Sequence, residues 1–174
     1  MSKFSVKFGV VFLLAGAVLT AVLLRPSIAR SQFFYMENED IGKEAKDFTL
    51  KVVNGEKTSL KDYREGKRAI IFFWATWCPH CVKELQVLNA QKEEIAKKNI
   101  KLVLVDVGEN ESIVGNYLKK RNIEMSVFLD EDSAVSDEYG LIGVPTFYLV
   151  DEQGIVVDVK HSLPEDLETV FTKT

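Results

Sequence analysis

The hydrophobic and polar positions of this chain change from strand-like to helix-like spacing and back. An uninterrupted apolar run from Ala69 to Trp74 has the length of a strand buried on both faces of a sheet, and the mostly apolar segment 101–107 predicts another strand of this kind. Between them, apolar residues recur every three or four positions among Lys and Glu, which predicts a helix from Cys78 to about Lys98. Strands that alternate with helices in this way, followed by a terminal hairpin and a last helix, predict an α/β fold with a mixed central sheet and helices on both faces.

Shorter patterns predict further elements on either side of this unit. Asn54-Gly55 is a hairpin turn signal, and Asp132 is placed to cap a helix. Ser162 and Glu165 have capping-box spacing with Pro164 between them, which predicts that a last helix begins there. The remaining predictions are strands at 48–52, 58–60, 125–129, 146–150 and 155–160, and helices or helical turns at 60–63, 111–121 and 133–139.

The N-terminal segment has the pattern of a membrane anchor. Residues 8–24 carry no charge and lie between Lys7 and Arg25, at the short end of the range for a spanning helix. Cleavage after Ser27-Ile28-Ala29, which would release a secreted form, is the alternative. The predicted organisation is a cytoplasmic segment at 1–7, a transmembrane signal anchor at 8–24, a tether at 25–40 and an extracytoplasmic domain at 41–174.

Charge and cysteine count exclude several classes of function. The net charge of -4 gives no support for nucleic-acid binding, which would need a clustered basic surface, so no nucleic-acid partner is expected. Two cysteines in 174 residues exclude a scaffold held by several disulfides, and no other cysteine completes a zinc site. The meaning of the cysteines therefore lies in their position next to each other.

The two cysteines form the sequence Cys78-Pro79-His80-Cys81 at the start of the predicted helix. The unpaired N–H groups and the dipole at a helix N-terminus favour a thiolate, so Cys78 is predicted to be the accessible nucleophile. Cys81, one turn further in, is predicted to be the resolving thiol. Pro79 fits an early helical position, and a protonated His80 would stabilise the thiolate and make the pair more oxidising.

Two other interpretations of the pair remain open. A structural crosslink is poorly served by this spacing, because closing so small a loop contributes only about 2 kcal/mol. A copper or zinc site formed by Cys78 and Cys81 with His80 or His161 is the other interpretation, and one CxxC without a second ligand pair supports it weakly.

The segment from Phe72 to Cys81 resembles the active-site turn of the thioredoxin superfamily. Further motifs resemble those of the membrane-anchored TlpA/ResA-like thiol–disulfide oxidoreductases, and the resemblance covers residues 41–160. It implies a thioredoxin-like three-layer fold with extra N-terminal strands and an inserted αβ element at 111–129, preceded by one transmembrane helix. These motifs are Ile41-Gly42-Lys43, Asp47-Phe48-Thr49-Leu50, Ser59-Leu60-Lys61-Asp62-Tyr63, Leu129-Asp130, Tyr139-Gly140 and Gly143-Val144-Pro145-Thr146-Phe147.

The resemblance also implies roles for individual residues. Pro145 corresponds to a cis-proline beside the disulfide, Val144 would tune substrate and redox behaviour, and Trp77 would border the site. Many thioredoxins carry a buried acid where this chain has Phe72. Glu84 is a candidate replacement as proton acceptor for the resolving thiol, and a solvated helix carboxylate is the equally weighted alternative.

By this resemblance the protein is expected to be an enzyme, a protein thiol–disulfide oxidoreductase that needs no cofactor. We expect a monomer anchored in a bacterial cell membrane that reduces protein substrates, for example in cytochrome c maturation, and exchanges electrons with an upstream membrane partner. A disulfide-forming oxidant or isomerase is an alternative, because Pro79-His80 resembles the dipeptide of strong oxidants. A peroxiredoxin-type peroxidase would need Thr-x-x-Cys, whereas Thr76 lies only two positions before Cys78. A copper metallochaperone using Cys78, Cys81 and His161 is the non-enzymatic alternative.

Overall fold

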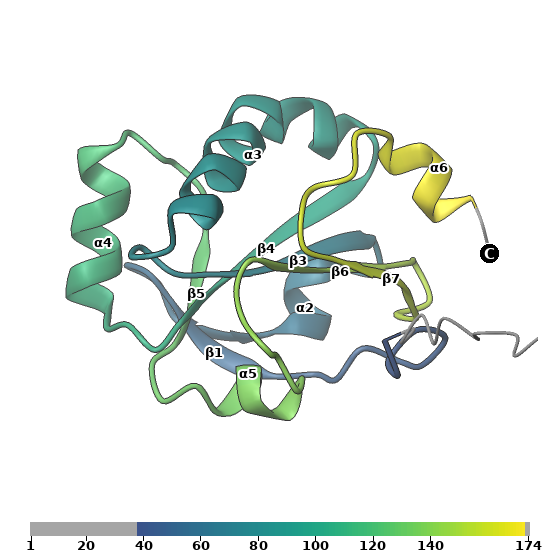
Figure 1. Cartoon of the computed structure of the whole chain (residues 1–174), viewed down its shortest axis with the longest axis horizontal. Helices are drawn as coiled ribbons and strands as arrows, with labels where there is room; N and C mark the ends of the chain where they lie inside the picture. The colour runs from purple at the N-terminus through teal and green to yellow at the C-terminus, as the bar shows by residue number, and fades with distance from the viewer. Residues whose placement is uncertain (1–37, 173–174) are drawn as a thin grey trace, which may run out of the picture. The chain divides into compact units, whose positions relative to one another are not determined.

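The computed structural model describes residues 38–172, which build one mixed seven-stranded sheet in this part of the chain (Figure 1). The strand order is β2-β1-β5-β4-β3-β6-β7, with β5, β4 and β3 parallel and the outer strands antiparallel to their neighbours. The strands are β1 (Thr49–Val52), β2 (Lys57–Ser59), β3 (Arg68–Trp74), β4 (Ile100–Val107), β5 (Val127–Asp130), β6 (Thr146–Val150) and β7 (Val156–Lys160).

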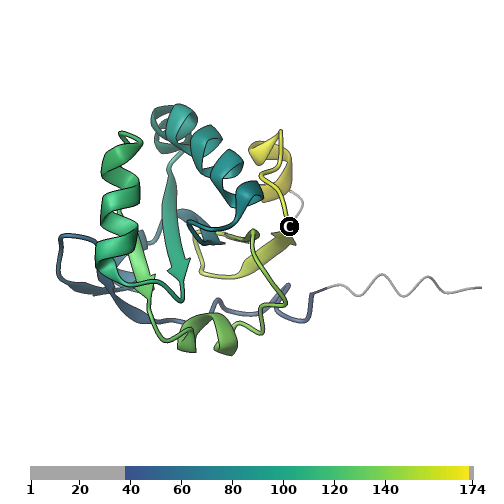
Figure 2. The same ribbon diagram turned by 60° about the vertical axis from the view of Figure 1, so that its left-hand side comes forward.

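Helices cover both faces of the sheet, as the α/β pattern predicts. One buried cluster joins one sheet face to α3, α4 and α6, and the other joins the opposite face to α2 and α5. Figures 1 and 2 show α3 and α5 on opposite sides of the sheet. The helices are α2 (Leu60–Arg64), α3 (Pro79–Lys97), α4 (Glu111–Lys120), α5 (Ala134–Glu138) and α6 (Leu167–Phe171). The three-layer arrangement and the inserted αβ element, α4 with β5, are thereby confirmed.

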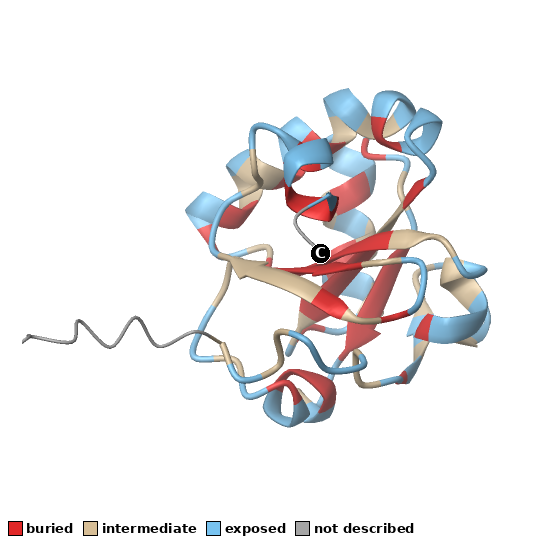
Figure 3. Ribbon diagram, turned by 90° about the vertical axis from the view of Figure 1, so that its right-hand side faces the viewer, coloured by how far each residue is buried: buried red, intermediate tan, exposed pale blue. Residues whose placement is uncertain are grey.

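Strand β3 occupies an inner position in the sheet and is buried along almost its whole length (Figure 3). It pairs in parallel with β4, where Trp74 is opposite Asp106, and antiparallel with β6, where Phe73 is opposite Thr146. Because of these directions, the ends of β3 and β4 meet the beginning of β6 at one edge of the sheet. The residues that follow β3 and β4 and precede β6 are therefore brought together.

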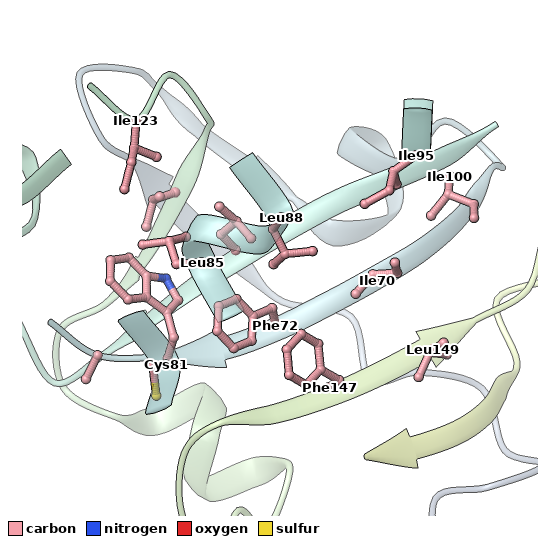
Figure 4. Close-up of a cluster of buried hydrophobic side chains, with 14 of the residues drawn as sticks. Ile70, Phe72, Cys81, Leu85, Leu88, Ile95, Ile100, Ile123, Phe147 and Leu149 are labelled. Carbon is pink, nitrogen blue, oxygen red and sulfur yellow. The ribbon is translucent and has the colours of Figure 1, made fainter. Parts of the chain in front are cut away.

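The side chains of β3 alternate between the two cores, as the period of a strand requires. Ile70, Phe72 and Trp74 face α3, whereas Ala69, Ile71 and Phe73 face α2 and α5. The Phe72 ring stacks on Phe147 with the ring centroids 4.4 Å apart, and Figure 4 shows both rings in the cluster that contains Cys81. Phe72 is fully buried. Because its side chain is an aromatic ring, this position provides no acid for the chemistry of the cysteines.

Some predicted boundaries are wrong. The last helix begins after Asp166, which accepts a hydrogen bond from the N–H of Thr169, and not at Ser162. The strand predicted at 125–129 is found slightly later, as β5 (Val127–Asp130). The N-cap residue of α5 is Ser133 and not Asp132, although Asp132 Oδ1 accepts a hydrogen bond from the N–H of Ala134.

The anchor prediction concerns residues that are not described. Segments 1–7 and 8–24 and most of the 25–40 tether lie outside the described residues. Within 38–172, no helix is long and apolar enough to cross a membrane.

Candidate active site

The two cysteines form a disulfide at the N-terminus of α3. Cys78 is the N-cap residue, Pro79 is the first helical residue, and the N–H of Cys81 donates to Cys78 Sγ at 3.1 Å. This N–H is one of the donors that a helix leaves unpaired at its start. The same group and the helix dipole would stabilise a negative sulfur on Cys78 after reduction.

The surroundings of the two sulfurs differ. Cys81 is fully buried in the apolar cluster beneath α3 (Figure 4), whereas Cys78 retains 5% exposure. Cys78 is thus the more accessible cysteine, although it is more covered than the sequence predicts. Trp77 is 69% exposed and His80 is exposed as well. Within the described chain, no hydrogen bond or ion pair fixes the His80 ring to Cys78.

A loop before β6 lies against the disulfide. The Val144–Pro145 peptide bond is cis, as the family resemblance implies, and the Val144 carbonyl oxygen lies 3.7 Å from Cys78 Sγ. Two contacts hold the loop at its base: Thr146 Oγ1 donates to the Gly143 carbonyl at 2.7 Å, and His161 Nδ1 lies 3.1 Å from the Pro145 carbonyl oxygen. Since a carbonyl only accepts, Nδ1 carries the proton.

Glu84 lies on α3, one turn after Cys81, and is half-buried. Its Oε2 accepts a hydrogen bond from the N–H of Leu163 at 3.3 Å. The segment after β7 therefore contacts the cis-proline loop through His161 and α3 through Leu163. The role of Glu84 as proton acceptor for Cys81 stays a prediction.

Two buried acids escaped the sequence reasoning. Asp106, at the end of β4, is fully buried, and Glu109 in the following loop is 9% exposed. Glu109 accepts from the Thr76 N–H at 2.6 Å and from Thr76 Oγ1 at 2.7 Å, so it holds the turn that leads to Cys78. The sequence signal that could have identified them is the single acid, Asp106, within the mostly apolar segment 101–107, followed three residues later by Glu109.

Burial raises the pKa of Asp106 to about 8, and the nearby Glu109 carboxylate adds to the shift. Asp130, on the neighbouring strand β5, makes a smaller contribution. The structure thus carries a buried acid near the active-site turn, on β4 instead of at Phe72 on β3.

The site does not assemble the ligands of the copper interpretation. Among residues 38–172, no group of three or more His, Cys, Asp and Glu side chains is arranged to hold a metal ion. His161 Nδ1 is instead directed to the Pro145 carbonyl and to Thr146 Oγ1, 3.3 Å away. The metallochaperone alternative therefore gains no support from this geometry.

Comparisons with known proteins agree with the geometry. The AhpC/TSA family profile matches residues 41–159. The thiol-disulfide oxidoreductase ResA of Bacillus subtilis is 32% identical over 149 residues, which cover 85% of this chain and 83% of that protein. The crystal structure of StoA from Bacillus subtilis is similar with a TM-score of 0.60 and 28% identity over 72% of this chain and 93% of that one. A thiol:disulfide interchange protein of the thioredoxin family from Chlorobium tepidum has a TM-score of 0.62 and 27% identity over 74% and 92% of the two chains.

The raised pKa of Asp106 predicts how stability depends on pH. In the folded state Asp106 holds its proton up to about pH 8, whereas in the unfolded chain it releases the proton near its usual 3.8. The folded state therefore binds more protons between these values, and its free energy of unfolding falls as the pH rises from about 4 to 8, by on the order of 1 kcal/mol per pH unit.

We expect Asp106→Asn to remove this loss, so that the variant gains stability over the wild type across that range. Urea unfolding of the oxidised protein at a series of pH values measures the difference. The exposed Asp132→Asn, which keeps an acceptor for Ala134, serves as the control. Parallel curves for wild type and Asp106→Asn would contradict the buried, protonated state of Asp106.

Proposed function

This chain belongs to the AhpC/TSA family of thioredoxin-like proteins and is a thiol–disulfide oxidoreductase related to ResA, and we propose that it reduces protein disulfides outside the cytoplasm. The observation that carries this proposal is the position of Cys78 Sγ. It lies between the N–H of Cys81 at the helix N-terminus and the Val144 carbonyl of the cis-proline loop. The first group would stabilise the attacking thiolate, and we propose that the backbone segment of the second binds the substrate peptide.

The reaction proceeds through two exchanges from the reduced protein. The Cys78 thiolate attacks one sulfur of the substrate disulfide, forming a mixed disulfide and releasing the other substrate sulfur as a thiolate. Cys81 then loses its proton and attacks Cys78 Sγ, which releases the second substrate thiol and forms the Cys78–Cys81 disulfide. Two electrons have passed from the protein to the substrate, and an upstream membrane donor restores the reduced pair.

Glu84 is the proposed acceptor for the Cys81 proton. Cys81 is fully buried among apolar residues, which disfavours its thiolate, so its attack requires a base within reach. Glu84 follows on the same side of α3 one turn later and remains half-buried. Its single described hydrogen bond, from the Leu163 N–H, leaves further acceptor capacity on the carboxylate.

The contacts of Cys78 favour a reductant over an oxidant. A strongly oxidising pair needs a thiolate that several donors stabilise in the reduced state. Within the described residues, Cys78 Sγ accepts from one backbone N–H, and the exposed His80 ring makes no hydrogen bond to it. We therefore propose that His80 tunes the potential only weakly, through solvent.

The cellular setting follows from the anchor expected at residues 8–24. We propose a monomer held in a bacterial cell membrane, with the catalytic domain on the outer side. Suitable substrates there are proteins whose cysteines must be kept reduced, such as the CxxCH haem-attachment sites of c-type cytochromes.

The reduction potential of the pair tests the direction of electron transfer. We expect the purified full chain, equilibrated with thiol buffers of known ratio, to have a potential below about -200 mV, on the thioredoxin side of the known range. The variant His80→Gln should move this value by less than about 30 mV, because the ring does not touch the sulfur. A potential above that threshold would favour the oxidant or isomerase alternative.

Trapping identifies the protein substrates. The variant Cys81→Ala cannot resolve the mixed disulfide, so we expect it to accumulate partners bound through Cys78, detected on non-reducing gels and by mass spectrometry. The double variant with Cys78→Ala as well should trap none. An absence of partners for Cys81→Ala in cells grown under oxidising or reducing conditions would argue against exchange with proteins.

The exposed apolar side chains around the disulfide predict a preference for protein substrates. Trp77 is 69% exposed, and Ile142, three residues before the cis-proline, is 101% exposed. Covering such a side chain on binding contributes on the order of 1 kcal/mol, so Trp77→Ala or Ile142→Ser should lower kcat/KM for insulin about fivefold.

Glutathione disulfide should be reduced by both variants at the wild-type rate, because it is too small to cover this surface. Ile113→Ser, on α4 and 47% exposed, is the matched control. Equal losses with insulin and glutathione disulfide would place the effect on the cysteines instead of on substrate binding.

A further inference from the structure

Two buried carboxyl groups lie beside the active-site turn and have no part in the exchange chemistry. Asp106 is fully buried, and in the described chain neither of its carboxylate oxygens has a hydrogen-bond partner. Glu109 lies three residues later at the same edge of the sheet and is nearly buried as well. An unpaired buried carboxylate is costly, so the arrangement calls for a proton on this pair.

The surroundings of Asp106 show where such a proton can go. Asp106 is opposite Trp74 in the β3–β4 register, so both side chains point to the sheet face covered by α3 and α4. From β3 the Trp74 indole N–H, and from α4 the Tyr117 hydroxyl, also lack a described partner. From α3, the cluster on this face contains Cys81, Leu85, Leu88 and Ile95.

The remaining acids near Asp106 are Asp130 and Glu109. Asp130, on β5, points to the opposite face, where it accepts from the N–H groups of Val135 and Ser136. Glu109 is therefore the acid with which Asp106 can form a hydrogen bond, once one of the two carries a proton.

Glu109 connects this pair to the catalytic cysteine. Its two oxygens accept from the backbone N–H and the hydroxyl of Thr76, at 2.6 and 2.7 Å. Thr76 precedes Cys78 by two residues, and the Cys78 N–H donates to the Ala75 carbonyl in the same turn. A change in the position or charge of Glu109 therefore acts directly on the backbone that carries Cys78.

We propose that Asp106 and Glu109 are positioning residues that share one proton, and that this proton keeps Glu109 bound to Thr76 and the turn in its active geometry. With Asp106 protonated, the pair carries one negative charge, on Glu109, and both hydrogen bonds to Thr76 are charge-assisted. When the proton leaves to solvent, two adjacent carboxylates repel each other, Glu109 is displaced from Thr76, and the additional charge disfavours the Cys78 thiolate.

The pKa of Asp106, raised to about 8 by burial and then by Glu109, places this transition just above neutral pH. The kinetic part of the inference rests on the proposed exchange at Cys78. The structural part concerns the hydrogen bonds to Thr76 and does not depend on that exchange.

Two readouts on the purified full chain test the inference. The first is the backbone amide signal of Thr76 in a ¹H–¹⁵N NMR titration from pH 6 to 10. We expect a shift with a midpoint near pH 8 that is lost in Asp106→Asn, which keeps the shape of the side chain and cannot ionise. Glu109→Gln, which retains an acceptor for Thr76, should lose it too, and Asp132→Asn should titrate like the wild type.

The second readout is the rate of alkylation of Cys78 by iodoacetamide in the reduced protein, followed by mass spectrometry. The wild-type profile should show the rise from thiolate formation and then a second inflection near pH 8, and Asp106→Asn should lose only the second. A Thr76 amide that titrates alike in wild type and Asp106→Asn, or not at all, overturns the shared proton. A Thr76 titration without the second inflection overturns its effect on Cys78, and intact insulin reduction in that case leaves the proposed function standing.

Discussion

The pairing of β3 with β4 on one side and β6 on the other is the constraint on which the site depends. The parallel register with β4 brings the residues after both strands to one edge, and the antiparallel register with β6 brings the cis-proline loop there as well. Cys78, Glu109 and Pro145 thus meet although they are far apart in the sequence. From Ala69 to Trp74 the side chains of β3 are buried in two different cores, and a shift by one residue would exchange the two sets and disrupt the packing of both.

At this edge of the sheet, the two cysteines lie in surroundings that affect a thiolate in opposite ways. The helix N-terminus directs the Cys81 N–H at Cys78 Sγ, whereas Cys81 itself lies among apolar side chains beneath α3. Phe72, which stacks on Phe147, occupies the position where a buried acid is found in many thioredoxins. The buried acid of this chain, Asp106, instead lies on the next strand and reaches the turn through Glu109 and Thr76. The two proposed acid–base groups thus act at different places, Glu84 on the resolving cysteine and the Asp106–Glu109 pair on the backbone of the attacking one.

The elements were largely predictable, and the exceptions have physical reasons. Long apolar runs and helical periodicity predicted β3, β4 and α3 within one or two residues, because their burial repeats regularly along the chain. The last helix was placed too early. The cap that the structure uses is Asp166, four residues after Ser162, and the Leu163 N–H is bound by Glu84 of α3. The capping signal at Ser162 is a local one, and local signals are weaker than tertiary contacts.

The sequence by itself determined the chemistry of the cysteines. Three local features establish it: the spacing of the cysteines, the helix that starts between them and the apolar strand before them. Each can be predicted because it depends only on residues that are neighbours in the sequence. Only the tertiary structure decided which acids matter and what holds the cis-proline loop. In the sequence, Asp106 is indistinguishable from any acid within a strand, and His161 from any surface histidine. Burial and register give the first a raised pKa and direct the second at the Pro145 carbonyl. Those properties arise from contacts between strands and loops distant in sequence, which no local pattern records.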